Sequence, residues 1–393
     1  MLVGMEEIRE KIQQQRVALV HDYLVQDGGA ERVFSAFQRI FPKAQPFVLI
    51  HNPKHTPPDF KGKHINTSFL NNWPLAKSKY QWYLPLLPMA AEQLDFSNYD
   101  LVISSSSSFA KGIIVPPHST HICYAHTTTR FLWEDRIGYL TDLPQPAIVR
   151  SILPFYLHSL RSWDRMAAER PDVLLTNSQT SRLRILRHYR RDSQVIYPPA
   201  DIDQIPLSKH PGDYWLAGGR LVAYKRFDLV VKAFAKLNLP LIVFGVGPEL
   251  EKLKKMAGKR TKFVGKVHEQ EKSRLYRHAI GFINPQVEDF GITTIEAMAA
   301  GRPIIAYGMG GAAETVIPGR TGVFIEAQTW EDIGDAVIRH KPADYDPKSI
   351  RAHAENFSFN SFQEKIIKCV ARHTNITSDE PALIGDMYAQ YFD

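Results

Sequence analysis

Short apolar runs alternate with helix-like stretches along most of the chain, and this alternation most restricts its fold. The runs lie at 17–20, 99–103, 119–127, 172–178, 194–199, 214–218, 241–244, 262–265, 279–284, 303–306 and 322–325. Buried strands that alternate with helices build parallel sheets with helices on both faces. The pattern therefore predicts an α/β protein with two doubly wound, Rossmann-like domains facing a central cleft.

The length and the prolines divide this series into two domains. With 393 residues and 44% apolar content, the chain can bury two ordinary cores. Pro198 and Pro199 interrupt the pattern, and the residues that follow, up to 213, have no apolar period. We therefore expect an N-terminal domain at 16–199, a C-terminal domain at 200–356 and a loosely attached tail at 373–393.

Composition points to a cytoplasmic protein with an anionic partner. Cys123 and Cys369 lie far apart, without the spacing of metal ligands, so neither a disulfide framework nor a zinc site is expected. No apolar run reaches 18 residues, and residues 1–16 are charged and Gln-rich. The net charge of +7 suits a nucleotide-activated substrate, an acidic membrane surface or nucleic acid. Nucleic acid is not expected, because no aromatic-basic recognition motif is present.

The stretch 287–303 reads as a strand end, a loop and a helix start. Amides at such a helix start point outward at the positive end of the helix dipole and can hold a phosphate or a sugar edge. These amides belong to Phe290, Gly291 and Ile292. Glu288 precedes the turn and Glu296 lies two turns into the helix, so each carboxylate is either a ligand for sugar hydroxyls or a solvated charge.

Two cations follow the first strand of the C-terminal domain. Arg220 and Lys225 share the loop that begins at Gly219, on the side of the predicted sheet where Glu288 lies. Arginine can bind two phosphate oxygens at once, and lysine adds a compact charge, so the pair suits a departing diphosphate. The alternative is that both are exposed surface residues.

Two features of the N-terminal domain lie where ligands bind in open parallel sheets. Gly28 and Gly29 come between the first strand and a helical pattern, where a positive φ and close backbone approach are available. They indicate either a ligand contact or an ordinary tight turn. His126 and Arg130 follow the strand at 119–127, although a single histidine is more often structural.

The segment 71–88 interleaves Trp, Tyr and Leu with Lys and Pro. This composition suits the interface of an anionic bilayer, and equally a domain core with prolines that bound short helices. Two Asp-x-Asp pairs, at 201 and 203 and at 344 and 346, are interpreted as linker and helix-start acids and not as a metal site.

Taken together, these residues resemble the retaining GT-B glycosyltransferases of the GT4 class, over about 16–373. The resemblance rests on Gly28-Gly29, His126, Gly219-Arg220 to Lys225, the stretch 245–248 and the Glu288/Glu296 pair. Segments 21–23, 28–32 and 121–133 are most similar to the branch of mannosyltransferases that assemble O-antigen and exopolysaccharide. Thr127-Thr128 departs from the proline often found there, which puts the shape of the acceptor loop in doubt.

The resemblance implies a nucleotide-sugar donor held mainly by the C-terminal domain. Arg220 and Lys225 would bind the diphosphate after Gly219, Glu296 the ribose, and Lys266-Val267 would lie near the base. Glu288 and the backbone of Phe290, Gly291 and Ile292 would bind the sugar, with His126 approaching it and Gly28-Gly29 near the phosphates. The catalytic residues implied are His126, Arg220, Lys225 and Glu288.

The family retains anomeric configuration, by front-face attack or, in an older alternative, by double displacement through Glu288. It needs no metal or other cofactor, and its last helix, here about 357–372, crosses back onto the first domain. We therefore expect transfer of mannose from GDP-mannose to a saccharide or lipid-linked saccharide, at the cytoplasmic face of a membrane. A nucleotide-sugar epimerase and a non-catalytic nucleotide-sugar-binding protein are the alternatives.

Overall fold

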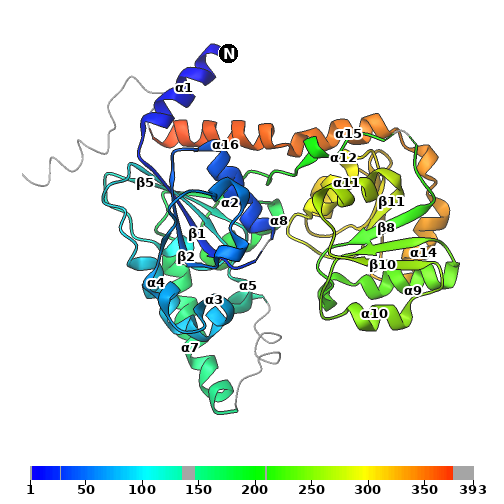
Figure 1. Ribbon diagram of the computed structural model, residues 1–393, viewed down its shortest axis with the longest axis horizontal. Coiled ribbons are helices and arrows are strands. Elements are labelled where there is room, and N and C mark those ends of the chain that lie inside the picture. The colour runs from blue at the N-terminus through cyan, green and yellow to red at the C-terminus, as the bar shows by residue number, and fades with distance from the viewer. Residues whose placement is uncertain (1, 27, 135–146, 209, 375–393) are drawn as a thin grey trace, which may run out of the picture. The chain divides into compact units, whose positions relative to one another are not determined.

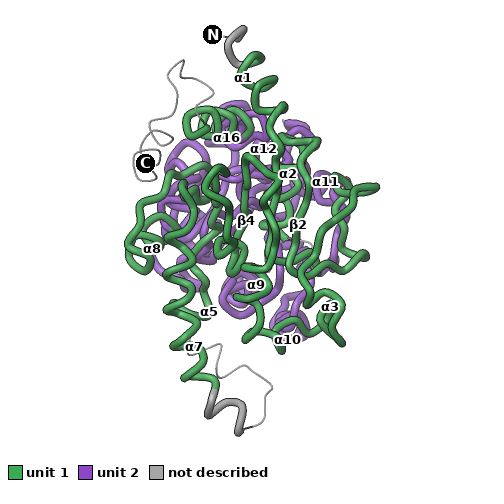
Figure 2. Tube along the Cα trace, turned by 90° about the vertical axis from the view of Figure 1, so that its left-hand side faces the viewer, with its two compact units in different colours: residues 1–177, 181–196, 363–393 green, residues 178–180, 197–362 purple. Residues whose placement is uncertain are grey.

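The computed structural model describes residues 2–26, 28–134, 147–208 and 210–374. The chain forms two compact units (Figure 2), of which the first comprises 1–177, 181–196 and 363–393 and the second 178–180 and 197–362. The predicted boundary after 199 lies three residues beyond the observed one. The last helix, α16 (Phe359–His373), begins in the second unit and continues into the first. Most of the predicted tail, from 375 onward, lies outside the described residues.

The first unit contains a seven-stranded parallel sheet in the order β3-β2-β1-β4-β5-β6-β7. Its strands are β1 (Val17–Leu24), β2 (Gln45–His51), β3 (Asn66–Thr67), β4 (Leu101–Ser106), β5 (Thr120–Ala125), β6 (Val173–Thr176) and β7 (Gln194–Val195). Its other helices are α1 (Leu2–Gln14), α2 (Gly29–Ile40), α3 (Ala76–Lys79), α4 (Leu87–Glu92), α5 (Arg130–Trp133), α7 (Ala147–Ala167) and α8 (Gln179–Tyr189).

Two strands of the first unit differ from the sequence prediction because they bury polar side chains. β1 continues through His21 and Asp22, which are 2% and 1% exposed, whereas the apolar run ends at 20. β4 extends into the serine run that was predicted to be a polar loop, and Ser104 to Ser106 are all buried. These buried polar groups are satisfied by hydrogen bonds across the sheet, described below.

The second unit contains a six-stranded parallel sheet in the order β10-β9-β8-β11-β12-β13. Its strands are β8 (Tyr214–Gly218), β9 (Leu241–Phe244), β10 (Thr261–Gly265), β11 (Ala279–Asn284), β12 (Ile304–Tyr307) and β13 (Gly322–Ile325). Its helices include α9 (Phe227–Leu237), α10 (Leu250–Met256), α11 (Glu269–His278), α12 (Ile292–Ala299), α13 (Ala312–Thr315), α14 (Trp330–Arg339) and α15 (Pro347–Ala354).

This sheet is covered on both faces (Figure 1). One core packs α9, α10 and α14 against it, with Phe234, Leu253 and Ile333 buried there. The other core packs α11, α12 and α15 against the opposite face, around Tyr276 and Ile295. All the strands predicted for this unit are present within one residue at each end, because most are apolar runs bounded by turn residues. The doubly wound architecture is confirmed.

Candidate active site

The loops after β8 and β11 lie next to each other at the point where the strand order of the second unit reverses. β8 lies between β9 and β11, so the chain winds to one side from β8 and to the other from β11. Residues 219–226 follow β8 and residues 285–291 follow β11, both at the carboxyl ends of neighbouring parallel strands. Doubly wound sheets bind ligands at such a point.

Lys225 and Glu288 meet across this point. The Nζ of Lys225 lies 2.5 Å from Oε1 of Glu288, and the two side chains are 12% and 17% exposed. Lys225 ends the short 3₁₀ turn Ala223–Lys225, while the carbonyl oxygen of Glu288 accepts a hydrogen bond from the N–H of Gly311 at 2.7 Å. The sequence predicted that these residues share a side of the sheet, but not that they form an ion pair.

Glycine is required beside Lys225 because the backbone here is crowded. Gly219 has a φ of +139°, and a Cβ at this position would lie 3.3 Å from the Nζ of Lys225. Gly245, with a φ of +114°, approaches so closely that a Cβ would meet the carbonyl oxygen of Gly219 at 1.8 Å. Arg220 is exposed and makes no ion pair with any residue that the structure describes. Of the two predicted cations, the structure therefore brings only Lys225 into contact with Glu288.

Helix α12 begins beside this ion pair. Gly291 is its N-terminal cap with a φ of +87°, and a Cβ there would lie 3.2 Å from Oε2 of Glu288. The first amides of a helix have no partner within it, so those of Ile292 and Thr293 are available to a ligand, while the Thr294 N–H donates to the carbonyl oxygen of Gly291 at 3.0 Å. The Phe290 side chain is 4% exposed and stacks on Tyr197 at 5.6 Å. A ligand can therefore meet only the backbone of Phe290.

Glu296 lies inside α12 and is held by two residues of α11. Its carboxylate accepts from the Nζ of Lys272 at 2.9 Å and from the hydroxyl of Tyr276 at 3.0 Å, and Glu296 is 1% exposed. The Lys272 ammonium also lies 2.7 Å from Oε2 of Glu269. The sequence analysis missed Lys272 and Tyr276. Their i,i+4 spacing on the buried face of α11 was the available signal, but a lysine in a helix usually lies in solvent.

Lys266 and Val267, the pair predicted to lie near the nucleotide base, follow β10. Lys266 is exposed, while Val267 is half-buried and packs against the core that contains α11 and α12. The structure therefore places Val267 on the same side of the sheet as α11. Their predicted place near a nucleotide base remains a prediction.

In the first unit, Gly28 and Gly29 lie where the chain passes from β1 into α2, as predicted, and Gly29 is the first residue of α2. Gly28 caps α2 with a φ of −143°, which is ordinary extended backbone, and neither glycine has a positive φ. The left-handed conformation that these glycines make available is therefore not used here. A Cβ at Gly28 would lie 2.6 Å from Oε2 of Glu31, a flexible side chain. A ligand contact at these glycines remains a prediction.

His126 follows β5 directly, as expected for a residue at a strand end. Its backbone N–H donates to the carbonyl oxygen of Ser106 at 2.9 Å, and its Nε2 lies 2.9 Å from Oγ of Ser105. Burial lowers the pKa of His126 to about 3, with a smaller contribution from His21, so the ring is neutral at physiological pH. Arg130, also noted from the sequence, is exposed at the first position of α5.

Asp22 ties β1 to the loop after β4, and sequence analysis gave it no role of its own. Its two carboxylate oxygens accept four hydrogen bonds, at 2.5 to 2.9 Å, from the backbone N–H groups of residues 107–110. Four donors compensate the burial of this charge, which is 1% exposed. A charged residue inside an extended apolar strand was the available signal.

Asp164 anchors the loop that follows His126. It forms a buried ion pair with Lys111 at 2.6 Å. It also accepts from Thr129, Trp133 and Tyr189 at 2.7 to 2.8 Å. One carboxylate on α7 therefore holds the side chains of Thr129 and Trp133 in this loop, and that of Tyr189 on α8. The sequence shows Asp164 only as one charge in a basic helix.

The segment 71–88 divides between core and surface. Leu84 and Leu87 are buried, as the core interpretation predicts. Trp73, Leu75 and Trp82 are 43%, 55% and 54% exposed, and the Nζ of Lys79 lies 4.3 Å from the centre of the Trp82 ring. Apolar and basic side chains thus share one exposed segment.

The Asp-x-Asp pairs behave as helix-start acids where the structure tests them. Asp346 caps α15, and its carboxylate accepts from the N–H groups of Lys348 and Ser349 at 3.1 Å. This part of the interpretation is confirmed. In the described residues, no three His, Cys, Asp or Glu side chains are grouped so as to hold a metal ion.

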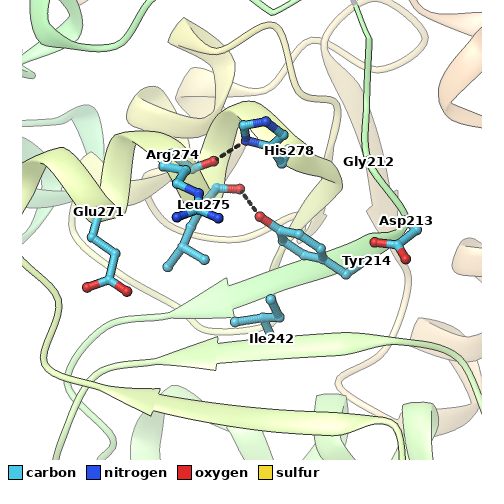
Figure 3. A pocket seen from close by; sticks show the side chains of 8 residues that line it. All are labelled: Gly212, Asp213, Tyr214, Ile242, Glu271, Arg274, Leu275 and His278. Carbon is cyan, nitrogen blue, oxygen red and sulfur yellow. Dashed lines mark hydrogen bonds between the residues drawn. The ribbon is translucent and has the colours of Figure 1, made fainter.

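A cavity of about 340 Å³ lies apart from these loops (Figure 3). Tyr214 and Ile242, near the amino ends of β8 and β9, line it together with α11 residues such as Arg274 and His278. The Tyr214 hydroxyl donates to the carbonyl oxygen of Leu275 at 2.9 Å. Because the amino ends of the strands are opposite to the ends that carry Lys225 and Glu288, this cavity is not the candidate site.

Two glycosyltransferase family models match the chain. Residues 27–204 match the model described as Glycosyltransferase Family 4, and residues 200–355 match Glycosyl transferases group 1. Together the two models match residues 27–355, so each half of the chain is similar to a glycosyltransferase domain.

Curated relatives resemble parts of the chain. A GDP-mannose-dependent alpha-(1-6)-phosphatidylinositol monomannoside mannosyltransferase of Mycobacterium tuberculosis is 34% identical over 136 residues, which are 30% of this chain and 35% of the relative. An uncharacterized glycosyltransferase of Methanocaldococcus jannaschii is 29% identical over 159 residues, 37% of this chain and 41% of the relative. The chain thus spans between about a third and two fifths of the length of these relatives.

Solved structures resemble the chain over most of its length. Anabaena HepE in complex with UDP and glucose has a TM-score of 0.67 at 17% identity, over 91% of this chain and all of that one. Sucrose-phosphate synthase of Thermosynechococcus elongatus has a TM-score of 0.66 at 17% identity, over 96% and 99% of the two chains. With the two parallel sheets described above, these likenesses show a GT-B fold.

Proposed function

We propose that this chain, built from two glycosyltransferase domains, is a retaining transferase that moves mannose from GDP-mannose to a saccharide or lipid-linked saccharide of a cell-surface polysaccharide. The observation that carries the proposal is the contact of Lys225 with Glu288 beside the start of α12. A cation, a carboxylate and free helix amides at a sheet switch point suit a diphosphate joined to a sugar.

In this proposal Lys225 and Arg220 stabilise the diphosphate as it leaves. The bond between the anomeric carbon and the phosphate oxygen breaks while the acceptor oxygen bonds to that carbon on the same face. The acceptor's proton passes to the leaving phosphate oxygen. Negative charge grows on the diphosphate during this step, so fixed cations next to it lower the barrier. No step requires a metal ion.

Support for mannose and GDP as the donor comes from resemblance. The branch resemblance and the Mycobacterium relative both name GDP-mannose, but that relative matches only 30% of the chain. HepE was solved with UDP and glucose, and at 17% identity it supports the fold alone. Donor specificity is therefore the first property to measure.

The activity test incubates the protein with GDP-mannose, and separately with UDP-glucose, each with and without a panel of saccharide and lipid-linked acceptors. We expect free GDP to appear from GDP-mannose only when an acceptor is present, with an α-linked product. A sugar interconverted without an acceptor would indicate an epimerase instead. Tight donor binding without turnover on any acceptor would indicate a binding protein.

We also propose that the exposed segment with Trp73, Leu75 and Trp82 contacts an anionic membrane surface. Aromatic rings and long basic stems both suit the bilayer interface, and Lys77 and Lys79 are exposed in the same segment. None of the helices described by the structure is long and apolar enough to cross a bilayer. Such a surface contact would bring the site to a lipid-linked acceptor.

A further inference from the structure

Three polar side chains form a buried hydrogen-bond chain across β1, β4 and β5 that the roles above do not explain. His21 of β1 lies opposite Ser105 of β4 in the sheet register. The Nδ1 of His21 lies 2.8 Å from the carbonyl oxygen and 3.2 Å from Oγ of Ser105. Oγ of Ser105 lies 2.9 Å from Nε2 of His126, which follows β5.

The first link fixes where His21 carries a proton. A carbonyl oxygen can only accept a hydrogen bond, so the Nδ1 of His21 must be the donor to Ser105. The same N–H also points to the Ser105 hydroxyl oxygen, which therefore accepts from this side. Stacking on Phe34, with ring centres 4.9 Å apart and 15° between the planes, holds the imidazole of His21 in place.

The second link then has one direction. Ser105 is fully buried, and its hydroxyl has a single proton that cannot go to the already protonated Nδ1 of His21. If Nε2 of His126 also donated, the hydroxyl proton would have no acceptor between these two rings, which is costly in a buried site. The arrangement that satisfies every group has the Ser105 hydroxyl donating to Nε2 of His126.

We infer that Ser105 is a positioning residue that keeps His126 in the Nδ1–H tautomer, so that His126 acts as a hydrogen-bond donor to an oxygen of the bound sugar nucleotide and not as a general base. The inference rests on the proposed function for its ligand. The tautomer assignment does not depend on the proposed function, because it follows from the contacts of Ser105.

Two further observations agree with this assignment. The backbone of His126 is anchored at both ends, because its N–H donates to Ser106 at 2.9 Å and its carbonyl oxygen accepts from Oγ of Ser181 at 3.1 Å. The ring packs edge-on against Tyr124 at 5.3 Å. The lowered pKa of about 3 keeps this imidazole neutral, as a fixed tautomer requires.

The first test reads the tautomer directly. The full-length protein, labelled with ¹⁵N-histidine, is examined by long-range ¹H–¹⁵N spectra at pH 7.5, with His126→Gln to assign the signals. We expect His126 to show a protonated Nδ1 and an unprotonated Nε2. In Ser105→Ala we expect this pattern to be replaced by the other tautomer or a mixture. A protonated Nε2 in the wild type would overturn the inference, and so would an unchanged pattern in Ser105→Ala.

A matched control is built into the same strand. Ser104, also fully buried, lies 2.8 Å from Nε2 of His121 in an equivalent pair that has no predicted part in the site. Ser104→Ala should lower thermal stability about as much as Ser105→Ala while leaving the His126 spectrum unchanged. A change of the His126 tautomer in Ser104→Ala would mean that general loosening of the sheet explains the effect.

The second test asks whether the donated proton reaches the ligand. Each hydroxyl of the donor sugar is replaced in turn by hydrogen, and kcat/KM is measured for the wild type and for Ser105→Ala. We expect one position at which the replacement costs the wild type about tenfold, the usual cost of one hydrogen bond, and Ser105→Ala almost nothing. Equal losses in both proteins at every position would overturn the donor role.

The two tests separate this inference from the proposed function. A wild type with the Nδ1–H tautomer but no sugar transfer from any donor would contradict the proposed function and leave the role of Ser105 in place. Active sugar transfer by a protein whose His126 is protonated at Nε2 would contradict the role of Ser105 and leave the proposed function in place. Ser105→Thr, which keeps the hydroxyl, should restore both the spectrum and the kinetics of the wild type.

Discussion

At the residue scale, the charge of Lys225 is the feature on which the proposed chemistry most depends. Its partner Glu288 is within 2.5 Å, so Lys225 is held in position before any anion arrives. We expect Lys225→Met to lower kcat/KM by a factor that corresponds to a loss of about 2–4 kcal/mol in transition-state stabilisation. The reason is that the charge on the leaving diphosphate loses its nearest cation. The loss in Arg220→Ala should lie in the same range, since the exposed guanidinium of Arg220 can reach a phosphate.

Steady-state kinetics with GDP-mannose measures this prediction. Lys252→Ala is the control, because Lys252 is an exposed lysine of the same unit, paired with Glu249 at 3.0 Å on α10. It should match the wild type. Turnover within twofold of the wild type in both Lys225→Met and Arg220→Ala would remove these residues from the diphosphate site.

His121 makes the stability of the protein depend on pH. It is fully buried, and burial lowers its pKa to about 3, helped by the charges of Arg191 and Arg170. Unfolded histidine binds a proton below about pH 6.5, whereas folded His121 does not until about pH 3. The stabilisation is therefore complete above pH 6.5 and is lost as pH falls towards 3, at roughly 1.4 kcal/mol per pH unit for this group.

Urea unfolding at pH 7.5, 6.5 and 5.5 checks this dependence in a range where most carboxylates stay charged. We expect the free energy of unfolding to fall between pH 6.5 and 5.5 in the wild type. His121→Gln, which keeps a polar group near Ser104, should reduce that fall by roughly 1 kcal/mol, because unfolded histidine is already half protonated at pH 6.5. The same slope in wild type and variant would show that His121 takes up its proton while folded.

At the element scale, α11 and α12 are joined by the buried contact of Lys272 with Glu296. Lys272→Met leaves the Glu296 carboxylate, 1% exposed, with Tyr276 but without a counter-charge, so we expect a loss of roughly 3–5 kcal/mol in unfolding free energy. Glu296→Gln should cost less, because Lys272 retains Glu269 at 2.7 Å. Urea unfolding measures both.

The double variant Lys272→Met/Glu296→Gln serves as the test of coupling between the helices. It should be more stable than Lys272→Met alone, since it removes the unpaired buried charge. If the two losses simply added, the helices would not be joined through this pair. If Glu296 also binds ribose, Glu296→Gln should in addition raise the KM for the donor.

The elements that the sequence predicted well are those whose burial is apolar. β8, β9, β11 and β13 match their apolar runs at both ends, and α12 begins inside the stretch 287–303, where a helix start was predicted. The N-terminal strands were harder because His21, Asp22 and Ser104 to Ser106 are buried by pairing with distant partners. No local pattern reveals such a partner. β2 is the exception, because it was not predicted although Phe47 to Ile50 form a buried apolar run.

The same difference applies to the candidate site. The positions of Lys225, Glu288 and His126 after strand ends could be predicted from the order of strands and helices, and their roles stay predictions. Lys272, Tyr276, Ser105 and Asp164 could not, because their roles depend on contacts between elements that the sequence does not place side by side. For Gly28 the position at the start of α2 was right, but residue type shows only that a positive φ is accessible and not whether the backbone adopts it.

At the scale of the whole molecule, the net charge of +7 and the exposed segment around Trp73 and Trp82 lead to one further prediction. We expect the protein to bind vesicles that contain anionic lipid and to be released by salt. Each lysine near an anionic surface contributes about 1 kcal/mol, so Lys77→Glu/Lys79→Glu should weaken binding by at least tenfold. Trp73→Ser/Trp82→Ser should weaken it on every lipid mixture, since insertion of the rings does not depend on charge.

Co-sedimentation with vesicles of rising anionic content, at 0.1 and 0.5 M salt, measures both variants. Phe155→Ser is the matched control, because Phe155 is 78% exposed but lies on α7, outside the segment 71–88. It should bind as the wild type does. Binding that ignores anionic content would contradict the electrostatic part of the prediction. Equal losses in Phe155→Ser and in the tryptophan variant would mean that exposed aromatic surface in general, and not this segment, holds the protein at the bilayer.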